Sequence, residues 1–594
     1  MLKIYNKDMK TTWELPLLYK SENDPQIQED IDLSAKNVKT FVKHWKANKE
    51  YTKDPKVLRI ALDEYEKLIA TTGICNKPYY YIELRNSLDQ TDANIKAKLG
   101  MITDTCTKLG NEIQFFELNI AKIPKSKQQQ FIDSDELKDY RHYLERIFEE
   151  SKYLLSDKEE KVFNITSRTA YENWVAMINE LTDKQSAVII DENLKEKEVS
   201  YNELMGFLNS TNKKVRDYAS KKFNEINSRY AEIAEFEINS VLGAKKAEDE
   251  YRKIPRPDLG RHLADDIESE IVDTLVDTVT KHFDISQRYY KRKAELMGLK
   301  KLGYHERNVP LEGKQAEYSY EESIELVQKI FNNLDPDFGE IVKMYLEHGQ
   351  YDVYPKEGKS GGAFCISMKK DLPTFILLNH KNKLTDVTTI AHESGHGIHA
   401  ELHKKQNALN DSSPIALAEV ASTFFEDFVY EEVLKDAKEE EERKPLLDTK
   451  LMDDISTIFR QVAFYNFEKE LHHDFREKGF LTKEYISDLF CKHMKSYLGD
   501  TVEEDESMRN GWIYVGHFRR FFYVYSYASG LLISKALQNL VKSDKTNIVL
   551  VKRFMESGSS MSPKELFKTL GIDISKKDIW ESGIKSIDAL LSKL

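Results

Sequence analysis

Amphipathic helical periodicity dominates the first half of this 594-residue chain and restricts the folds that it can adopt. Apolar residues recur at three- and four-residue spacing, with Lys and Glu between them, which is typical of helices with one buried face. With 32% charged residues, 40% apolar residues and little glycine or proline, the composition also favours a mainly α fold. The segments with the clearest periodicity are Asp30 to Tyr51, Leu58 to Thr72, Asp92 to Ala121, Ser134 to Ser151 and Ser210 to Tyr251.

No Pro/Gly/Ser-rich linker, low-complexity tract or internal repeat divides the chain. We therefore expect one continuous body, with an N-terminal helical region over residues 1–200 and a second region over residues 201–594 that holds the motifs described next. Between Tyr351 and Asn379 the pattern changes to short apolar runs around the glycine-rich stretch KEGKSGG. This change predicts a small β-sheet within the helical body.

Charge and cysteine content restrict the partners and the compartment. The net charge of −13 argues against nucleic acid as a partner, because phosphate binding needs a basic patch. The four cysteines are far apart in the sequence and form no metal-binding or redox cluster, which favours a reducing compartment. Neither a signal peptide nor an apolar stretch of membrane-spanning length is evident, so we expect a cytoplasmic protein without a membrane partner. The oligomeric state cannot be inferred from the sequence.

The strongest chemical motif is HExxH, formed by His392, Glu393 and His396. On a helix this spacing puts both imidazoles on one face, one turn apart, where they can hold one zinc ion per chain, while Glu393 can take a proton from a water molecule. A bare HExxH also occurs by chance on ordinary solvated helices, so its context has to decide. The context predicts a strand and then a helix through the motif. Residues 372–379 form an apolar run of strand length, and Asp386 is an acid in the first turn of the predicted helix.

Gly395 and Gly397 are unusual inside this predicted helix. Each costs on the order of 1 kcal/mol relative to alanine. We therefore expect another segment to pass close to the helix at these positions.

Two residues compete to be the third zinc ligand. His399 lies seven residues after His392, which places it about 10 Å further along the helix axis. Glu419 belongs to a second predicted helix that begins at Ser413-Pro414, and it can approach from the open side. We favour Glu419 as the ligand and place His399 beside the site.

The glycine-rich stretch and the run after it suggest a place for a peptide. Gly361, Gly362, Ala363 and Phe364 lie between the predicted strands, and a free strand edge can pair with an extended peptide. An ordinary hairpin turn explains the same residues. Cys365 is interpreted as a packed thiol rather than a nucleophile, because no thiolate-stabilising histidine or helix start is evident beside it.

A second unusual run is WIYVGHFRRFFYVYSYASG, over residues 512–530. As a packing helix it would bury several hydroxyls that need partners. His517 and the tyrosines Tyr523, Tyr525 and Tyr527 could instead stabilise a developing oxyanion. Packing still explains most of the aromatic residues, so we expect one to three of them to act.

Taken together, HESGHGIHAEL, AEVASTFFED, KEGKSGGAF, HFRRFFYVYSYASG and GSSMSPKELFKTLGIDISKKDIW resemble the oligoendopeptidase F and thimet oligopeptidase family of zinc metallopeptidases, most closely its oligoendopeptidase F branch. The resemblance extends over essentially the whole chain, including Trp13-Glu14-Leu15. It implies a mainly helical fold of two halves that enclose a deep, narrow channel, with zinc on its floor and a small sheet beside it.

The resemblance also implies roles for individual residues. His392, His396 and Glu419 correspond to the zinc ligands and Glu393 to the general base, and Glu426 resembles an acid that holds a histidine tautomer. His517 and the tyrosines correspond to groups that bind substrate carbonyls and the oxyanion, with Tyr525 and Tyr527 preferred and Tyr523 also a candidate. The run departs from the thimet branch in its His-to-Tyr spacing, and LGYHERNVPLEG lacks an expected Asp, so no function is assigned to His305.

These features predict a zinc-dependent endopeptidase that cleaves internal bonds of short, unstructured oligopeptides. One alternative is a carboxypeptidase or dipeptidyl carboxypeptidase, in which Arg519 or Arg520 would hold the terminal carboxylate of the substrate. Another is a non-catalytic peptide-binding protein, which is disfavoured because every catalytic position holds a competent residue.

Overall fold

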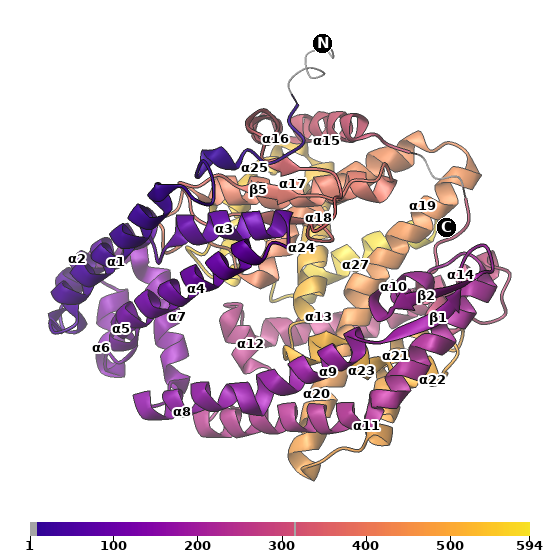
Figure 1. The fold of residues 1–594 in the computed structure, drawn as a ribbon, viewed down its shortest axis with the longest axis horizontal. Coiled ribbons are helices and arrows are strands. Elements are labelled where there is room, and N and C mark those ends of the chain that lie inside the picture. Colours follow the sequence, from indigo (N-terminus) through magenta and orange to yellow (C-terminus); the bar gives the residue numbers. More distant parts are fainter. Residues whose placement is uncertain (1–8, 314–316) are drawn as a thin grey trace. The chain divides into compact units, whose positions relative to one another are not determined.

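The computed structural model describes residues 9–313 and 317–594. Over these residues the fold is mainly α-helical, as the periodicity predicts, with one two-stranded and one three-stranded sheet (Figure 1). Within the same ranges, none of the helices combines the length and the apolar character needed to cross a membrane. The prediction of a mainly α fold with a small sheet is confirmed.

The chain divides into two compact units, each built from three separate segments. Unit 1 comprises residues 1–152, 315–432 and 537–572, and unit 2 comprises residues 153–314, 433–536 and 573–594. The predicted division after residue 200 does not coincide with this partition, because it falls inside unit 2, between strand β2 and helix α10. Helical periodicity is a local signal and does not report which distant segments pack together.

The elements of unit 1 are mostly helices, with a small sheet in the second segment. In chain order they are η1 (Leu15–Leu17), α1 (Pro25–Trp45), η2 (Glu50–Thr52), α2 (Pro55–Thr71), α3 (Asn76–Leu88), α4 (Ala93–Ile113), α5 (Phe115–Ala121), α6 (Lys125–Ile132), η3 (Asp135–Tyr140), α7 (Arg141–Glu150), α15 (Tyr320–Leu334), α16 (Pro336–His348), β3 (Tyr351–Asp352), β4 (Phe364–Ile366), β5 (Phe375–Leu377), α17 (Leu384–His403), α18 (Ile415–Asp436), η9 (Lys545–Asn547), α25 (Ile548–Glu556) and α26 (Pro563–Thr569).

The elements of unit 2 include a 40-residue helix and a β-hairpin, and the division between the units falls within α18, after residue 432, and within α24, after residue 536. In chain order, from the short helix η4 (Ser151–Tyr153) at its start, they are α8 (Asp157–Ser167), η5 (Arg168–Glu172), α9 (Asn173–Asp183), β1 (Ser186–Ile190), β2 (Glu196–Ser200), α10 (Tyr201–Phe207), α11 (Lys213–Arg252), α12 (Leu259–Ala264), α13 (Ser269–Lys281), α14 (Phe283–Leu296), η6 (Tyr304–Asn308), α19 (Glu440–Ile455), η7 (Ser456–Arg460), α20 (Gln461–Lys478), α21 (Lys483–Leu498), α22 (Glu506–Arg509), α23 (Gly511–Tyr514), η8 (Gly516–Arg519), α24 (Tyr525–Ser543) and α27 (Lys577–Leu591).

Aspartate caps start several helices of unit 1. Asp24 and Asp54 each accept a hydrogen bond from a first-turn main-chain N–H, and each is followed by a proline at the first helical position. Asp92 caps α4 in the same way, through the N–H groups of Asn94 and Ile95. These side chains satisfy donors that a helix N-terminus leaves unpaired, and proline fits there because its missing N–H is not needed.

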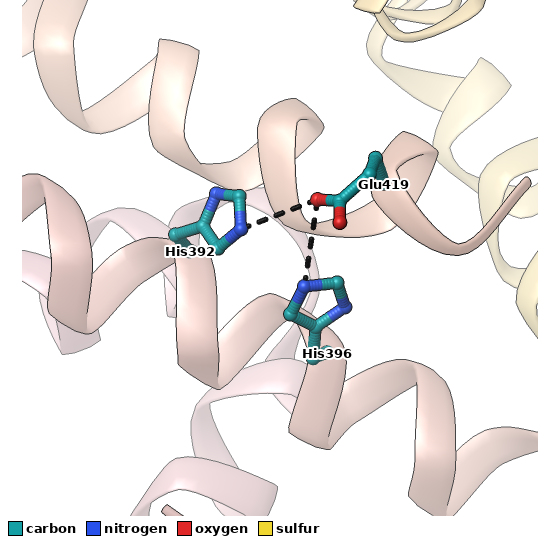
Figure 2. A group of neighbouring side chains, drawn as sticks. All are labelled: His392, His396 and Glu419. Carbon is teal, nitrogen blue, oxygen red and sulfur yellow. Dashed lines mark ion pairs between the residues drawn. The ribbon is translucent and has the colours of Figure 1, made fainter. Parts of the chain in front are cut away.

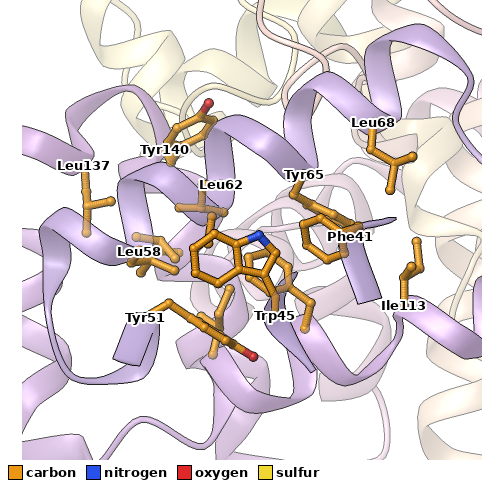
Figure 3. Packing of buried hydrophobic residues seen from close by; sticks show 14 of the residues in the cluster. Phe41, Trp45, Tyr51, Leu58, Leu62, Tyr65, Leu68, Ile113, Leu137 and Tyr140 are labelled. Atoms are coloured by element: carbon orange, nitrogen blue, oxygen red, sulfur yellow. The ribbon is translucent and has the colours of Figure 1, made fainter. Parts of the chain in front are cut away.

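A hydrophobic cluster joins α1, α2, α5 and α7 within unit 1 (Figure 3). Phe41 lies against Tyr65, with ring centroids 5.4 Å apart, and edge-on against Phe116 at 5.1 Å. The indole N–H of Trp45 donates to Glu64 at 2.8 Å, so the polar end of this large side chain is satisfied. The predicted amphipathic faces therefore meet as a common core.

The three-stranded sheet has the order β3-β5-β4, with β3 parallel and β4 antiparallel to β5. Trp13, near the start of the described chain, donates its indole N–H to the main-chain oxygen of Ile376 at 2.9 Å and packs edge-on against Phe375. Tyr80 donates to the carbonyl oxygens of Ile366 and Pro373. Trp13 and Tyr80 thus anchor the sheet from residues about 300 positions away.

In unit 2 the β1–β2 hairpin packs on α10 and α11. Ile189 and Val199 of the hairpin, Tyr201 of α10 and Phe223 of α11 belong to one buried cluster. Tyr514 of α23 packs against Phe223, with ring centroids 5.1 Å apart. This places the start of the aromatic run 512–530 against α11.

Candidate metal and catalytic site

Helices α17 and α18 approach closely at the glycines of the HExxH segment. A Cβ at Gly395 would lie 2.8 Å from the Cα of Ser422 on α18, and one at Gly397 would lie 2.6 Å from the ring of Tyr345 on α16. Both distances are shorter than real Cβ contacts allow, so alanine at either position would push the helices apart. The prediction that another segment passes close to these glycines is confirmed.

This close approach brings His392, His396 and Glu419 together (Figure 2). The Oε2 atom of Glu419 lies 3.3 Å from Nε2 of His392 and 3.6 Å from Nε2 of His396. The three candidate donor atoms lie within 4.8 Å of one another. Two imidazole nitrogens and a carboxylate oxygen are a donor set of catalytic zinc sites, and three protein donors leave one position open.

A second layer of side chains orients these three groups. Oε2 of Glu426 lies 3.0 Å from Nδ1 of His392, which leaves Nε2 of that ring directed at Glu419. The hydroxyl of Ser422 donates to Oε2 of Glu419 at 3.0 Å. The role of Glu426 was predicted from the sequence and that of Ser422 was not. Ser422 lies three residues after Glu419, so the two residues share a helix face.

The electrostatics of the cluster favour a cation. Burial alone would raise the pKa of Glu419, but hydrogen bonds from His392 and His396 hold it below its ordinary value. Burial alone would lower the pKa of His392, yet the neighbouring carboxylates, Glu419 first, raise it to about 10. The raised pKa of His392 reports the negative charge of the carboxylates around it, which a divalent ion would also offset. The residues therefore fit a zinc ion in donor type, spacing and charge.

Glu393 lies beside the cluster in a buried position, with 7% of its surface exposed. Burial raises the pKa of its carboxyl group, and the nearby His392 and His396 and a hydrogen bond from the main-chain N–H of Cys365 oppose that rise. A carboxyl group whose pKa is moved toward neutrality is suited to accept and return a proton. Burial also raises the pKa of the Cys365 thiol well above its ordinary value, which agrees with a packed thiol.

His399 lies outside this group. Its side chain is buried, its ring packs 5.4 Å from Phe554 of α25 and 5.5 Å from His403, and burial holds its pKa well below the ordinary value. Among the described residues it forms no hydrogen bond with His392, His396 or Glu419. Its predicted place beside the metal ligands is corrected, because two helical turns beyond His392 it lies under α25 and serves packing.

The glycine-rich stretch lies next to strand β4. Gly361 and Gly362 are exposed with open space around them, and Gly362 has a φ of 71°, which favours glycine. Ala363 and Phe364 lead into β4, which is an edge strand of its sheet among the described residues. Phe364 packs toward Trp13, with ring centroids 6.4 Å apart.

Side chains hold this stretch in a defined conformation. Lys359 forms a buried ion pair with Asp352 of β3 at 2.7 Å and also donates to the carbonyl oxygen of Tyr354. Asn379 donates to the carbonyl oxygens of Ser360 at 2.9 Å and Gly362 at 2.7 Å. These contacts hold the glycine-rich stretch in place, so it is not a freely flexible loop. The sequence pattern KEGKSGG did not indicate that its lysine would form such an anchor.

In unit 2, three of the predicted aromatic-run residues form a cluster. Nε2 of His517 lies 3.3 Å from the hydroxyl of Tyr527, and the His517 ring stacks at 6.3 Å on Tyr523. Tyr523 and Tyr527 meet edge-on at 5.4 Å. All three side chains are partly exposed.

Tyr525 points the other way. It is fully buried and its hydroxyl donates to Oδ2 of Asp265 at 2.6 Å. This burial argues against its predicted catalytic role and leaves Tyr523 and Tyr527 as the candidates. Tyr523 lies just before α24 and Tyr527 in its first turn, so no regular helical spacing in the sequence marks this pair.

Arg519 is also unavailable for substrate. It is buried and pairs with Glu237 of α11, with Nη2 and Oε2 2.7 Å apart. Arg520 is exposed. The clamp that a carboxypeptidase would need is therefore not supplied by Arg519.

Two family models match this chain. The model described as peptidase family M3 matches residues 166–586, and the model described as oligopeptidase F matches residues 119–184. The chain belongs to peptidase family M3. It is accordingly a metalloendopeptidase, and peptidases of this family are generally zinc-dependent. The resemblance inferred from the motifs is confirmed.

Relatives and solved structures agree with this assignment. The chain is 27% identical over 543 residues to oligopeptidase PepF of Bacillus subtilis, covering 90% of this chain and 80% of the relative. It is 25% identical to an oligoendopeptidase F homolog of Lactococcus lactis, covering 98% and 97%. The fold is similar to that of oligoendopeptidase-F from Enterococcus faecium, with a TM-score of 0.69 and 21% identity over 96% of this chain and 98% of that one. A crystal structure of a protein from Chlamydophila abortus has a TM-score of 0.86 at 23% identity, over 98% of each chain.

Proposed function

We propose that this chain is a zinc-dependent endopeptidase that hydrolyses internal bonds of short, unstructured oligopeptides. The observation that carries the proposal is the convergence of His392, His396 and Glu419 beside the buried Glu393. The relatives named oligopeptidase and oligoendopeptidase F support the substrate class.

In this proposal His392, His396 and Glu419 hold one zinc ion. Zinc, when bound, supplies a Lewis acid that polarises a carbonyl oxygen and makes a water molecule easier to deprotonate. Glu426 keeps His392 in the tautomer whose Nε2 faces the metal, and Ser422 fixes the carboxylate of Glu419.

Glu393 is the proton-transfer group. Its carboxylate takes the proton of the attacking water and returns it to the nitrogen of the leaving amine. Its burial and raised pKa support both steps, because the protonated form must be accessible during the cycle. His517, Tyr523 and Tyr527 bind the substrate carbonyl groups and the developing oxyanion, since they present an imidazole and two hydroxyls from one cluster.

The peptide binds in extended form along the edge of β4, next to Gly361, Gly362, Ala363 and Phe364. The Lys359 and Asn379 contacts keep that edge in place before substrate arrives. The cytoplasmic location stays a prediction from the sequence.

Mass-spectrometric digestion of a random peptide mixture tests the proposal, with and without a chelator, and with zinc added back. We expect chelator-sensitive cleavage inside the peptides, including peptides whose two termini are blocked. Exclusive release of C-terminal residues or dipeptides would instead favour a carboxypeptidase, and peptide binding without cleavage would favour a non-catalytic role.

A further inference from the structure

A pocket of about 220 Å³ in unit 2 contains two arginines without an acidic partner. It lies between helices α10 and α11, on which the β1–β2 hairpin packs, and Tyr514 at the start of the aromatic run 512–530. Its walls include Ser220 and Phe223 of α11, Arg307 and Asn308 of η6, Arg460 of η7 and Tyr514 of α23.

Each of these guanidinium groups has a buried Nε atom without a hydrogen-bond partner among the described residues. Arg460 forms no hydrogen bond or ion pair with any described residue, and its Nε atom is buried. The buried Nε of Arg307 also lacks a partner, although its Nη1 donates to the carbonyl oxygen of Tyr304 and its guanidinium lies over the Tyr304 ring at 3.9 Å. Buried donors without partners are rare in native proteins and need an explanation.

The nearest acids along the chain are already paired. Glu306, next to Arg307, contacts Arg216 at 2.8 Å and Lys213 at 3.2 Å. Other partly buried arginines of unit 2 show the ordinary pattern, since Arg256 pairs with Asp258 and Asp273. The groups that raise the pKa of Arg307 against the effect of its burial are tyrosine hydroxyls, not carboxylates. The positive charge of the pocket is therefore not neutralised by the described part of the chain.

The pocket and the His517 cluster are linked by one short stretch of chain. Tyr514, which lines the pocket, precedes His517 by three residues. Burial lowers the pKa of His517, and the positive charges of Arg460 and Arg520 lower it further, so the charge of Arg460 acts on that ring. A ligand in the pocket would therefore be next to the residues proposed to bind the substrate.

We propose that Arg307 and Arg460 form a subsite for a carboxylate of the peptide substrate, which is either its C-terminal carboxylate or an Asp or Glu side chain. This inference rests on the proposed peptidase function. Guanidinium groups match carboxylates in geometry and bind them by charge-assisted hydrogen bonds, often in pairs. The unpartnered Oδ1 of Asn308 can accept an N–H of the same peptide, which suits an amino-acid residue better than a simple anion.

Two pairs of quenched fluorescent peptides test the subsite and separate the two sources of the carboxylate. The first pair shares one sequence and ends in either a free carboxylate or an amide. The second pair is amidated and carries either Glu or Gln at the last position. The wild-type enzyme is expected to cleave the charged member of at least one pair with a kcat/KM higher by roughly 10- to 100-fold, the scale of one or two hydrogen bonds to a charged group.

Arg460→Gln and Arg307→Gln should each reduce this preference to near unity, measured as the ratio of kcat/KM for the charged and neutral peptides in the same variant. Arg288→Gln is the matched control, because Arg288 is an exposed arginine of unit 2 that pairs with Asp588. Arg460→Gln breaks no ion pair or hydrogen bond with the described residues, so it should keep the wild-type Tm. Arg307→Gln also removes the hydrogen bond and ring contact with Tyr304, so its Tm is expected to fall, and Arg460→Gln tests the subsite independently if Arg307→Gln misfolds.

Equal cleavage of both members of both pairs by the wild-type enzyme overturns the subsite, as does a preference that persists in both variants. Cleavage without preference leaves the peptidase proposal intact. If no peptide is cleaved, the peptidase proposal fails, and fluorescence anisotropy of the same labelled peptides on Glu393→Gln applies the charged-versus-neutral comparison without turnover. Equal Kd values for the charged and neutral peptides would then overturn the subsite.

Discussion

The two groups of candidate residues differ in the backbone that carries them. His392, His396, Glu419 and Glu426 lie on two regular helices, α17 and α18, and their spacing along the sequence fixes which of them share a face. The cluster of His517, Tyr523 and Tyr527 lies in a segment where short helical turns alternate with irregular backbone.

That irregular segment contains two adjacent non-glycine residues in the left-handed region. Phe521 and Phe522 have φ values of 48° and 57°. Such conformations cost on the order of 1–2 kcal/mol per residue and persist only where the surroundings enforce them. Here the buried carboxyl of Glu468 on α20 accepts the Phe522 N–H at 2.9 Å, and the His472 ring packs 4.7 Å from Phe522. Helical spacing therefore predicts the first group of candidate residues and fails for the second.

If Glu393 of unit 1 transfers the proton, Glu393→Gln should lower kcat more than any of the other substitutions proposed. The variant keeps the size of the side chain but cannot take a proton, so kcat should fall by roughly 10²–10⁴-fold while zinc stays bound. Steady-state kinetics and metal analysis of the same preparation check this. Wild-type turnover in the variant would remove unit 1 from the chemistry.

Glu419→Ala and His399→Ala test whether helix spacing identifies ligands correctly. Glu419→Ala should lose zinc and activity, because one of three protein donors is gone. His399→Ala should keep one zinc per chain and lose roughly 1–3 kcal/mol of unfolding free energy, since it leaves a cavity under Phe554. Metal stoichiometry and denaturant unfolding are the measurements. Zinc loss in His399→Ala alone would reverse the assignment.

The aromatic run can be tested with hydroxyl deletions on its two faces. Tyr527→Phe should lower kcat by roughly 10²–10³-fold if it donates to the oxyanion, and Tyr523→Phe tests the other candidate in the same assay. Tyr525→Phe should leave kcat unchanged and cost roughly 1–3 kcal/mol of stability, because Asp265 loses a buried donor. A comparable fall in kcat for Tyr525→Phe would restore the catalytic role that the sequence predicted for Tyr525.

Glu468→Gln tests the irregular segment of unit 2 through the pH dependence of the unfolding free energy. Burial raises the pKa of Glu468 to about 8, so between about pH 4.3 and pH 8 the folded chain holds a proton that the unfolded chain has released. This carboxyl therefore lowers the unfolding free energy as pH rises, by about 1.4 kcal/mol per pH unit across that window. The variant should match wild type near pH 4 and be the more stable protein near pH 8. Parallel unfolding curves across the window would contradict the buried, protonated state.

Much of the fold and of the first group of candidate residues was predictable because the signals are local. Periodicity predicted helices, the glycines of HESGHG predicted a close approach, and the position of Glu419 on a separate helix favoured it over His399. The division into units, the burial of Tyr525 and the unpaired Arg307 and Arg460 were not predictable, because they depend on contacts between residues hundreds of positions apart. Arg460 in particular is an ordinary charged residue of a helical pattern until the structure shows that its Nε atom is buried without a partner among the described residues.

The three-segment construction of each unit has a consequence for biosynthesis. The helices that carry His392 and Glu419 leave the ribosome well before residues 537–572, which contribute the last part of unit 1, and unit 2 is completed only by residues 573–594. Because domains made from distant segments must close long loops before their contacts form, unit 1 cannot reach its final packing until residues 537–572 have been synthesised, nor unit 2 until residues 573–594 have been. The final packing around the proposed metal site is thus expected to form long after its own two helices have been synthesised.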